Sequence, residues 1–231
     1  MGTLQAPERS PVRAVQRAFE LLALLGGERP AATLSEFARA SALPVSTVAR
    51  LLAALEHAAL LRREDDGRYV PGSRLVQIGL SALRGVSVYE LAEPHLRRLS
   101  EASSETANLA VRADAGNAVY LRQVISPHSI HHASWLGRLL PLRKTAIGTA
   151  LLGQVNAAGY VVRRDTLERG VTAIAAPVRG RGGEIVAAFS ITGPSYRIGG
   201  KDEKRFGALV RREAERASAA LGAASPRRGR R

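Results

Sequence analysis

Three polar residues, Ser46, Thr47 and Arg50, stand close together in a stretch that is otherwise rich in aliphatic side chains. Hydroxyl and guanidinium groups are among those that contact base edges and phosphates in the major groove of DNA. The apolar residues around them repeat with helical spacing: Val48, Leu51, Leu52 and Leu55. This pattern predicts a helix that buries its aliphatic side and offers the three polar residues, in its N-terminal half, to a duplex.

Two short helices around a tight turn are expected to position these residues. Helical spacing covers residues 34–41 and 45–57, and Thr33 is suited to cap the first of the two. An earlier helix is expected at residues 12–25, with these side chains on one face: Val15, Phe19, Leu22 and Leu25. The alternative is a helical hairpin in an ordinary helical domain, which periodicity alone does not exclude.

A β-hairpin is predicted directly after the third helix. Residues 60–63 and 68–70 have strand character, and the segment Glu64-Asp-Asp-Gly67 between them supplies an Asp-Gly turn. A short hairpin in this place is a wing, and we expect Arg68 to contact DNA from it. The combination predicts a winged helix-turn-helix domain over residues 12–72.

A helical linker is expected at residues 73–86. Leu75, Ile78 and Ala82 share one side of it, and Gly79 beside them would allow another helix to approach closely. This face is a candidate for subunit pairing. The alternative is a connector that packs only on its own chain.

The rest of the chain predicts a second domain, of the α+β class, over residues 87–222. Helices are expected at residues 88–103, 145–155 and 202–221. Pro94 implies a kink or a break in the first of them. Strands are expected at residues 108–111, 118–124, 160–164, 174–178 and 185–192, with hairpin turns at 114–117 and 179–183. Residues 223–231 are expected to form a basic disordered tail.

From Val12 to about Arg197 the chain resembles IclR-type transcriptional regulators. In the first half the resemblance rests on Arg13-Ala-Val-Gln-Arg-Ala-Phe-Glu-Leu-Leu22, Leu43-Pro-Val-Ser-Thr-Val-Ala-Arg-Leu-Leu52 and Gly67-Arg-Tyr-Val-Pro-Gly-Ser-Arg-Leu75. In the second half it rests on Gly137-Arg-Leu-Leu-Pro-Leu142, Ala146-Ile-Gly-Thr-Ala-Leu-Leu152, Gly170-Val-Thr-Ala-Ile-Ala-Ala-Pro-Val178 and Ala187-Ala-Phe-Ser-Ile-Thr-Gly-Pro194. The joint order and spacing of these motifs is the specific signal.

The resemblance implies a DNA-binding regulator with a GAF-like C-terminal domain that senses a small organic acid. It also implies assembly as a homodimer or a dimer of dimers on a double-stranded DNA operator. The positions that match the family's effector site are Leu140, Ala146, Ile147, Arg163, Val171, Ala173, Ser190 and Thr192. A hydroxyl-bearing, apolar site with one arginine suits a small anionic metabolite, whose carboxylate would meet Arg163.

The chain departs from the family pattern in three places. Arg163 and Thr166 stand where relatives have an acidic or small polar residue and, three positions later, Glu. Only a few residues separate Leu152 from Gly159, where relatives have a few dozen more, so the effector domain is expected to be shortened. Val45 stands where relatives often have Lys or Arg. The alternative function is therefore a DNA-binding regulator whose shortened C-terminal domain only oligomerises.

Composition bounds the function further. The chain has no cysteine, so it has no thiol nucleophile and no zinc–thiolate site. His128, His131 and His132 lack ligand-spaced partners, and no phosphate-binding loop, hydrolase elbow or paired-carboxylate motif is present, so we expect no metal, no cofactor and no enzyme. With no signal peptide and no membrane span in the sequence, the protein is expected in the cytoplasm.

The net charge of +14 is unevenly distributed. Residues 1–72 hold nine Arg against eight Asp and Glu, so nearly all of the excess lies in residues 73–231. The prediction of DNA binding therefore depends on the placement of a few side chains rather than on bulk charge.

Overall fold

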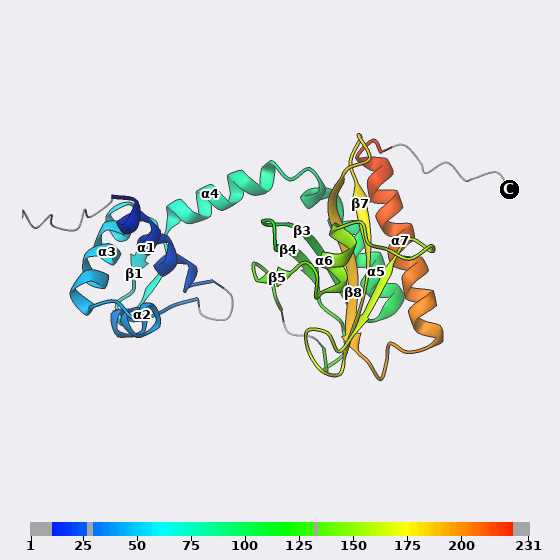
Figure 1. Cartoon of the computed structure of the whole chain (residues 1–231), viewed down its shortest axis with the longest axis horizontal. Coiled ribbons are helices and arrows are strands. Elements are labelled where there is room, and N and C mark those ends of the chain that lie inside the picture. Colours follow the sequence, from blue (N-terminus) through cyan, green and yellow to red (C-terminus); the bar gives the residue numbers. More distant parts are fainter. Residues whose placement is uncertain (1–10, 27–29, 132–133, 224–231) are drawn as a thin grey trace, which may run out of the picture. The chain divides into compact units, whose positions relative to one another are not determined.

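The structure is a computed structural model that describes residues 11–26, 30–131 and 134–223. The chain divides into two compact units, Met1–Gly85 and Val86–Arg231 (Figure 1). Residues 224–231 of the predicted basic tail lie outside the described residues. None of the described helices is long and apolar enough to cross a membrane.

Three helices and a short hairpin build the body of the N-terminal unit. They are α1 (Pro11–Ala23), α2 (Leu34–Ser41), α3 (Val45–His57), β1 (Leu61–Arg63) and β2 (Tyr69–Pro71). Their common core is made of side chains that are at most 2% exposed: Leu21, Phe37, Val48, Leu52 and Leu61. This architecture confirms the predicted winged helix-turn-helix fold.

The turn between α2 and α3 follows from local sequence signals. The Thr33 hydroxyl accepts a hydrogen bond from the Glu36 N–H (3.3 Å), and the Glu36 carboxylate accepts one from the Thr33 N–H (2.7 Å), so α2 starts with a capping box. Ala42 adopts a left-handed conformation, with φ of 53°, and ends α2. Pro44 then precedes the first residue of α3. This short turn fixes the angle at which α3 leaves the domain.

The face predicted for α1 is buried only in part, since Leu25 is buried and Leu22 is half-buried against the same core. Val15 and Phe19 are 54% and 63% exposed, whereas Leu21 and Leu25 are buried. The helix ends at Ala23, so Leu25 is placed by the following turn and not by the helical period. With Leu21 directed into the core, the face that bears Val15 and Phe19 is left at the surface.

Helix α4 (Ser73–Arg84) completes the N-terminal unit and has no buried residue. Its start is tied to the hairpin, because the Gly72 N–H donates to the Leu60 carbonyl (2.9 Å). A Cβ on Gly72 would come within 2.2 Å of the Ala59 carbonyl oxygen, so only glycine fits here. Beyond this anchor, the apolar side chains of α4 lie at the surface, among them Val76, Ile78 and Leu80.

An antiparallel sheet of six strands forms the C-terminal unit, in the order β5-β4-β3-β8-β7-β6. The strands are β3 (Thr106–Arg112), β4 (Asn117–Val124), β5 (Leu139–Pro141), β6 (Val161–Arg164), β7 (Val171–Arg179) and β8 (Ile185–Pro194). The helices are α5 (Val88–Ser103), α6 (Ala146–Leu151) and α7 (Lys201–Ala220).

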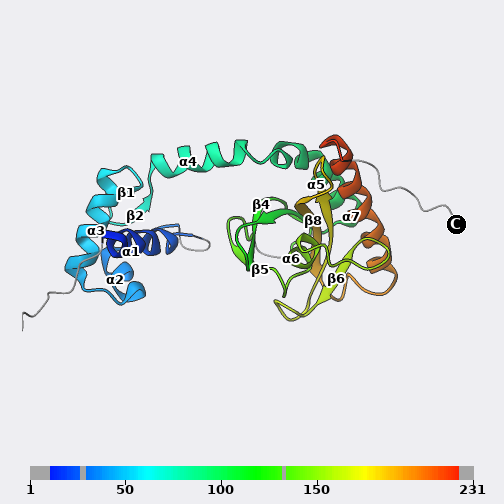
Figure 2. The ribbon, with the colours of Figure 1, turned by 45° about the horizontal axis from the view of Figure 1, so that its top comes forward.

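The helices cover both faces of this sheet (Figures 1 and 2). α5 and α7 pack on one face, over a core that includes Leu99, Phe189 and Val210. α6 packs on the other face, over Ala175, Ala188 and their neighbours. The α+β class and the helix-covered sheet expected from the sequence are both confirmed.

Two predictions for this domain were wrong in detail. The three-residue strand β5 was not expected, because so short a segment has no alternating pattern. α6 ends at Leu151 and not at residue 155, because Gly153 turns the chain with a φ of +74°. Pro94 does not break the predicted span, since α5 is continuous and Pro94 is exposed on it.

Candidate DNA-contacting surface and effector cavity

Helix α3 separates its apolar and polar residues as the sequence predicts. Val48, Leu52 and Leu55 are buried in the core of the N-terminal unit. Ser46 and Arg50 are exposed, and Thr47 is half-buried near the start of the helix. These three side chains can therefore meet the donors and acceptors of a major groove.

The hairpin of β1 and β2 presents Arg68 at the surface. The Glu64 N–H donates to the Arg68 carbonyl (2.8 Å), and the Gly67 N–H donates to the Glu64 carbonyl (2.9 Å). Gly67 has a φ of +81°, which the turn requires. The Asp66 carboxylate accepts a hydrogen bond from the Arg68 N–H (3.0 Å), so the backbone of the wing tip is fixed while the Arg68 side chain is exposed.

Val45, the first residue of α3, is 56% exposed. The helix therefore presents an apolar side chain at its leading end, next to Ser46. Such a group can contact a thymine methyl but cannot neutralise a phosphate.

A cavity on the α6 face of the C-terminal sheet brings together six of the eight predicted effector residues. It lies between α6, strands β6 and β7, and the segment that joins these strands. The six are Ala146, Ile147, Arg163, Val171, Ala173 and Thr192. The cavity holds about 420 Å³ of empty space, part of it open to solvent, but the centre of a water molecule can occupy only about 40 Å³ of it. Its interior is narrow.

The other two predicted residues lie behind this lining. Leu140 is 2% exposed and packs in the core beneath α6. Ser190 is 1% exposed, and its hydroxyl accepts a hydrogen bond from the Asn108 amide (3.2 Å). Six further residues line the cavity and were not assigned to it from the sequence: Tyr120, Trp135, Thr145, Thr166, Leu167 and Glu168.

The start of α6 forms one wall because its sequence allows a close approach to the chain before it. The Thr145 hydroxyl accepts a hydrogen bond from the Gly148 N–H (3.1 Å) and donates one to the Pro141 carbonyl (3.0 Å). A Cβ on Gly148 would lie 2.4 Å from the backbone of Leu142. Glycine at this position therefore lets α6 rest directly on the residues that follow β5.

A polar floor underlies the cavity. The Asn108 amide donates to Ser190 (3.2 Å) and to Thr192 (3.3 Å), and the Gln123 amide donates to the Asn108 carbonyl oxygen (2.8 Å). Burial raises the pKa of Tyr120 to about 12, although hydrogen bonds with Ser190 and Thr192 oppose this shift. The Tyr120 phenol is therefore neutral at physiological pH and can donate a hydrogen bond.

Arg163 and Glu168 are the two charged side chains in the lining. Arg163 pairs with Ala173 in the ladder of β6 and β7, two residues from Val161, which packs beneath α6. Because strand residues alternate between faces, Arg163 is directed to the α6 face as well. A ligand in the cavity would meet one cation and one anion, against largely apolar walls.

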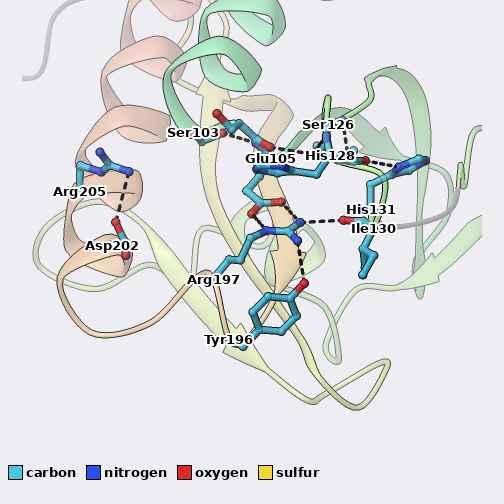
Figure 3. Close-up of polar contacts among 12 residues, drawn as sticks. Ser103, Glu105, Ser126, His128, Ile130, His131, Tyr196, Arg197, Asp202 and Arg205 are labelled. Carbon is cyan, nitrogen blue, oxygen red and sulfur yellow. Dashed lines mark hydrogen bonds and ion pairs between the residues drawn. The ribbon is translucent and has the colours of Figure 1, made fainter.

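The segment that brings Trp135 to the cavity is held at its base by an ion pair. Arg197 pairs with the buried carboxylate of Glu105, and its Nη2 also donates to the Ile130 carbonyl (2.9 Å; Figure 3). The Ser126 hydroxyl donates to the Ser104 carbonyl (2.6 Å). These contacts join the segment after β4 to the turn after β8 and to the turn between α5 and β3. Among the described residues, no group of three His, Cys, Asp or Glu could hold a metal ion; His132 lies outside them.

Family models match both units of the chain. The IclR helix-turn-helix domain matches residues 14–65. The model for the C-terminal domain of the bacterial transcriptional regulator IclR matches residues 80–155 and 151–219. The chain belongs to the IclR family. Its members are bacterial transcriptional regulators that bind DNA through the helix-turn-helix domain.

Curated relatives in this family match over almost their whole length. The transcriptional repressor IclR of Escherichia coli K12 is 26% identical, over 94% of this chain and 93% of the relative. The HTH-type transcriptional repressor AllR of the same strain is 27% identical, over 96% and 94%. The alignment with the IclR repressor runs over 254 positions, more than the 231 residues of this chain, so the relative has residues that this chain lacks.

Solved structures of IclR proteins share the fold. The Thermotoga maritima IclR matches with a TM-score of 0.71 and 25% identity, over 91% of this chain and 99% of that chain. An IclR homolog from Microbacterium hydrocarbonoxydans, complexed with 4-hydroxybenzoate, matches with a TM-score of 0.75 and 23% identity, over 90% and 98%.

Proposed function

We propose that this IclR-family protein is a cytoplasmic transcriptional regulator that releases or engages its operator in response to a small organic acid. The observation that supports it best is the division of α3, which buries its aliphatic side and exposes Ser46 and Arg50. These residues and Thr47 read base edges in the major groove, and Arg68 contacts a phosphate from the wing.

Subunit pairing through α4 completes the operator-binding form. A twelve-residue helix is marginal in water when no side chain of it is buried. The Leu75, Ile78 and Ala82 face, with Gly79 open beside it, supplies the apolar surface that a second copy would cover. A homodimer or a dimer of dimers then spaces two recognition helices by about 34–36 Å or a multiple of it.

The effector is an anionic metabolite bound over the sheet. The narrow apolar cavity takes its carbon body, and Arg163 takes its carboxylate in a charge-assisted pair. The relative complexed with 4-hydroxybenzoate supports a carboxylic acid as the class of ligand.

Two measurements test this function. Selecting random duplexes on the purified protein should yield a pseudo-palindromic operator, and failure to enrich any sequence would contradict specific DNA reading. Isothermal titration with a panel of short aliphatic and aromatic acids, repeated on the protein–operator complex, should identify acids that bind and change operator affinity. If no acid binds, the C-terminal domain serves only assembly.

A further inference from the structure

A second, wider cavity adjoins the effector cavity along the seam between α6 and β6. It is an open groove lined by Thr149, Gln154, Asn156, Tyr160 and the residues of β6 up to Arg163. The centre of a water molecule can occupy about 390 Å³ of this groove, against about 40 Å³ of the effector cavity. The narrow cavity is apolar, whereas hydroxyl and amide side chains line much of the groove.

Arg163 lies where the two spaces meet, because it lines both of them. Its guanidinium has several donors, so it can hold a carboxylate at this boundary. A ligand whose carboxylate is paired with Arg163 then has two directions in which to extend. Its apolar body fits the narrow cavity, and any further group attached beside the carboxylate enters the groove.

The chain makes only a short connection between α6 and β6 where it borders this groove. The family model for the C-terminal domain matches in two segments that meet at residues 151–155, so the residues that relatives have between them are missing here. The remaining connection is a compact turn, in which the Asn156 side-chain oxygen accepts from the N–H groups of Ala158 (2.9 Å) and Tyr160 (3.3 Å). This turn borders the groove.

The wall opposite α6 suits an amide in particular. β6 is the last strand of the sheet, so one side of its backbone has no strand partner among the described residues. An edge strand offers N–H and C=O groups to any peptide-like group alongside it. Gln154, exposed at the rim, adds a side-chain amide that can donate and accept.

We propose that the effector is an acid with an amide-bearing arm beside its carboxylate, as in an N-acylated amino acid. The apolar body occupies the effector cavity, Arg163 pairs with the carboxylate, and the amide binds between the edge of β6 and Gln154. This inference rests on the proposed function of the cavity as the effector site.

Two probes that differ only in this arm test the proposal. They are 3-phenylpropanoate and N-acetyl-L-phenylalanine, titrated calorimetrically into the full-length protein. The acetylated probe should bind about tenfold more tightly, because it gains hydrogen bonds in the groove. The Gln154→Ala variant should reduce this preference. Gln77→Ala, which removes an exposed amide from α4, should leave it unchanged.

The outcomes separate this proposal from the proposed function. If both probes bind the wild type equally well, or if Gln154→Ala keeps the full preference, the groove does not bind the arm and the proposal is overturned. Acid sensing would then still stand. If neither these probes nor any acid of the panel binds, the proposed effector function itself fails.

Discussion

The arginines of this molecule differ in their surroundings. Arg50 is exposed on the polar side of α3, and Arg68 is exposed at the tip of a fixed turn. Arg163 lines a largely apolar cavity, whereas Arg197 is committed to the buried Glu105. The first two are available to a duplex and the third to a small anion, but the fourth is already neutralised within the fold.

Replacing Arg50 by Ala should weaken operator binding by about 1–3 kcal/mol and relax specificity at one base position. The reason is that a base-reading guanidinium makes hydrogen bonds that discriminate between bases. Fluorescence anisotropy with the selected operator and its single-base variants measures both effects. Arg205→Ala, which removes the same charge from an exposed ion pair on α7, is the control. Unchanged affinity and specificity in folded Arg50→Ala would reject the role.

Replacing Arg163 by Ala should weaken binding of short acids at least about tenfold, because the carboxylate loses a charge-assisted hydrogen bond. Calorimetric titration measures the loss. Arg164→Ala is a matched control. Arg164 is the next residue of β6, and its guanidinium pairs with the carboxylate of Glu203 (2.6 Å). Acid binding that survives in Arg163→Ala but falls in Arg164→Ala would refute the assignment.

Sequence reasoning found the residues that local patterns mark and missed those that only the fold brings near. Arg163 and Thr192 were found because they match family positions. Trp135 belongs to a segment with no periodic pattern, and an ion pair between Glu105 and Arg197 anchors the base of that segment. No spacing in the sequence relates these residues, since the contact depends on the packing of β3, β8 and the segment after β4.

Among the elements, α4 is distinguished by having no buried side chain, while α1 leaves Val15 and Phe19 exposed in the same unit. The hydrophobic period of a helix predicts that one face will be covered, but it does not show which element or subunit covers that face. For α1 the predicted face is covered at Leu22 and Leu25 but not at Val15 and Phe19. For α4 the predicted face is apolar, and Ile78 and Ala82 are exposed on it while Leu75 is half-buried.

Replacing Ile78 by Asp should convert the protein to monomers, because the charge would be buried unpaired in the proposed interface. Sedimentation velocity measures the change. Gln77→Asp introduces the same charge on the polar side of α4 and should sediment like the wild type. A dimeric Ile78→Asp variant would place subunit contacts elsewhere.

The packing of α5 on α7 encloses a carboxylate, Glu213, that is 1% exposed. It accepts hydrogen bonds from Arg98 (2.9 Å) and Arg216 (2.7 Å), and the Nδ1 of His95 lies 2.9 Å from it. Burial acts to raise the pKa of Glu213, but hydrogen bonds from His95 and Arg98 and the nearby positive charges outweigh it, so the pKa is lowered.

A lowered pKa means that Glu213 stabilises the fold above its unfolded pKa and loses this effect as the pH falls through its folded pKa. Glu213→Gln should therefore lower the free energy of unfolding at pH 7 by about 1–3 kcal/mol. The difference from the wild type should shrink below about pH 4, where the carboxylate of the unfolded chain becomes protonated. Urea titrations of both proteins at pH 7 and below about pH 4 measure this difference in the free energy of unfolding. If the free energies of unfolding of Glu213→Gln and the wild type differed by the same amount at both pH values, Glu213 would not be ionised in the folded protein.

At the scale of the whole molecule, the chain has two units with separate cores; in the proposed function one reads DNA and the other senses a ligand. Their order, class and main elements were predictable, since capping residues, turns and periodic runs are local signals. The shortened connection before β6 was visible in the sequence, but the groove beside it was not. Only the three-dimensional packing of α6 and β6 shows that an open groove lies beside this connection.

If α4 pairs subunits as proposed, its exposed surface links the regulator's activity to its own abundance. With the proposed pairing, each chain acquires its full packing only after meeting another copy, so the fraction of competent molecules rises with total concentration. Transcription from the gene that encodes the protein then becomes an input to the switch, alongside the effector. Where the subunits are mostly dissociated and the operator is far from saturated, halving the supply of this chain lowers operator occupancy by more than half, and the response is steeper without any additional contact to DNA.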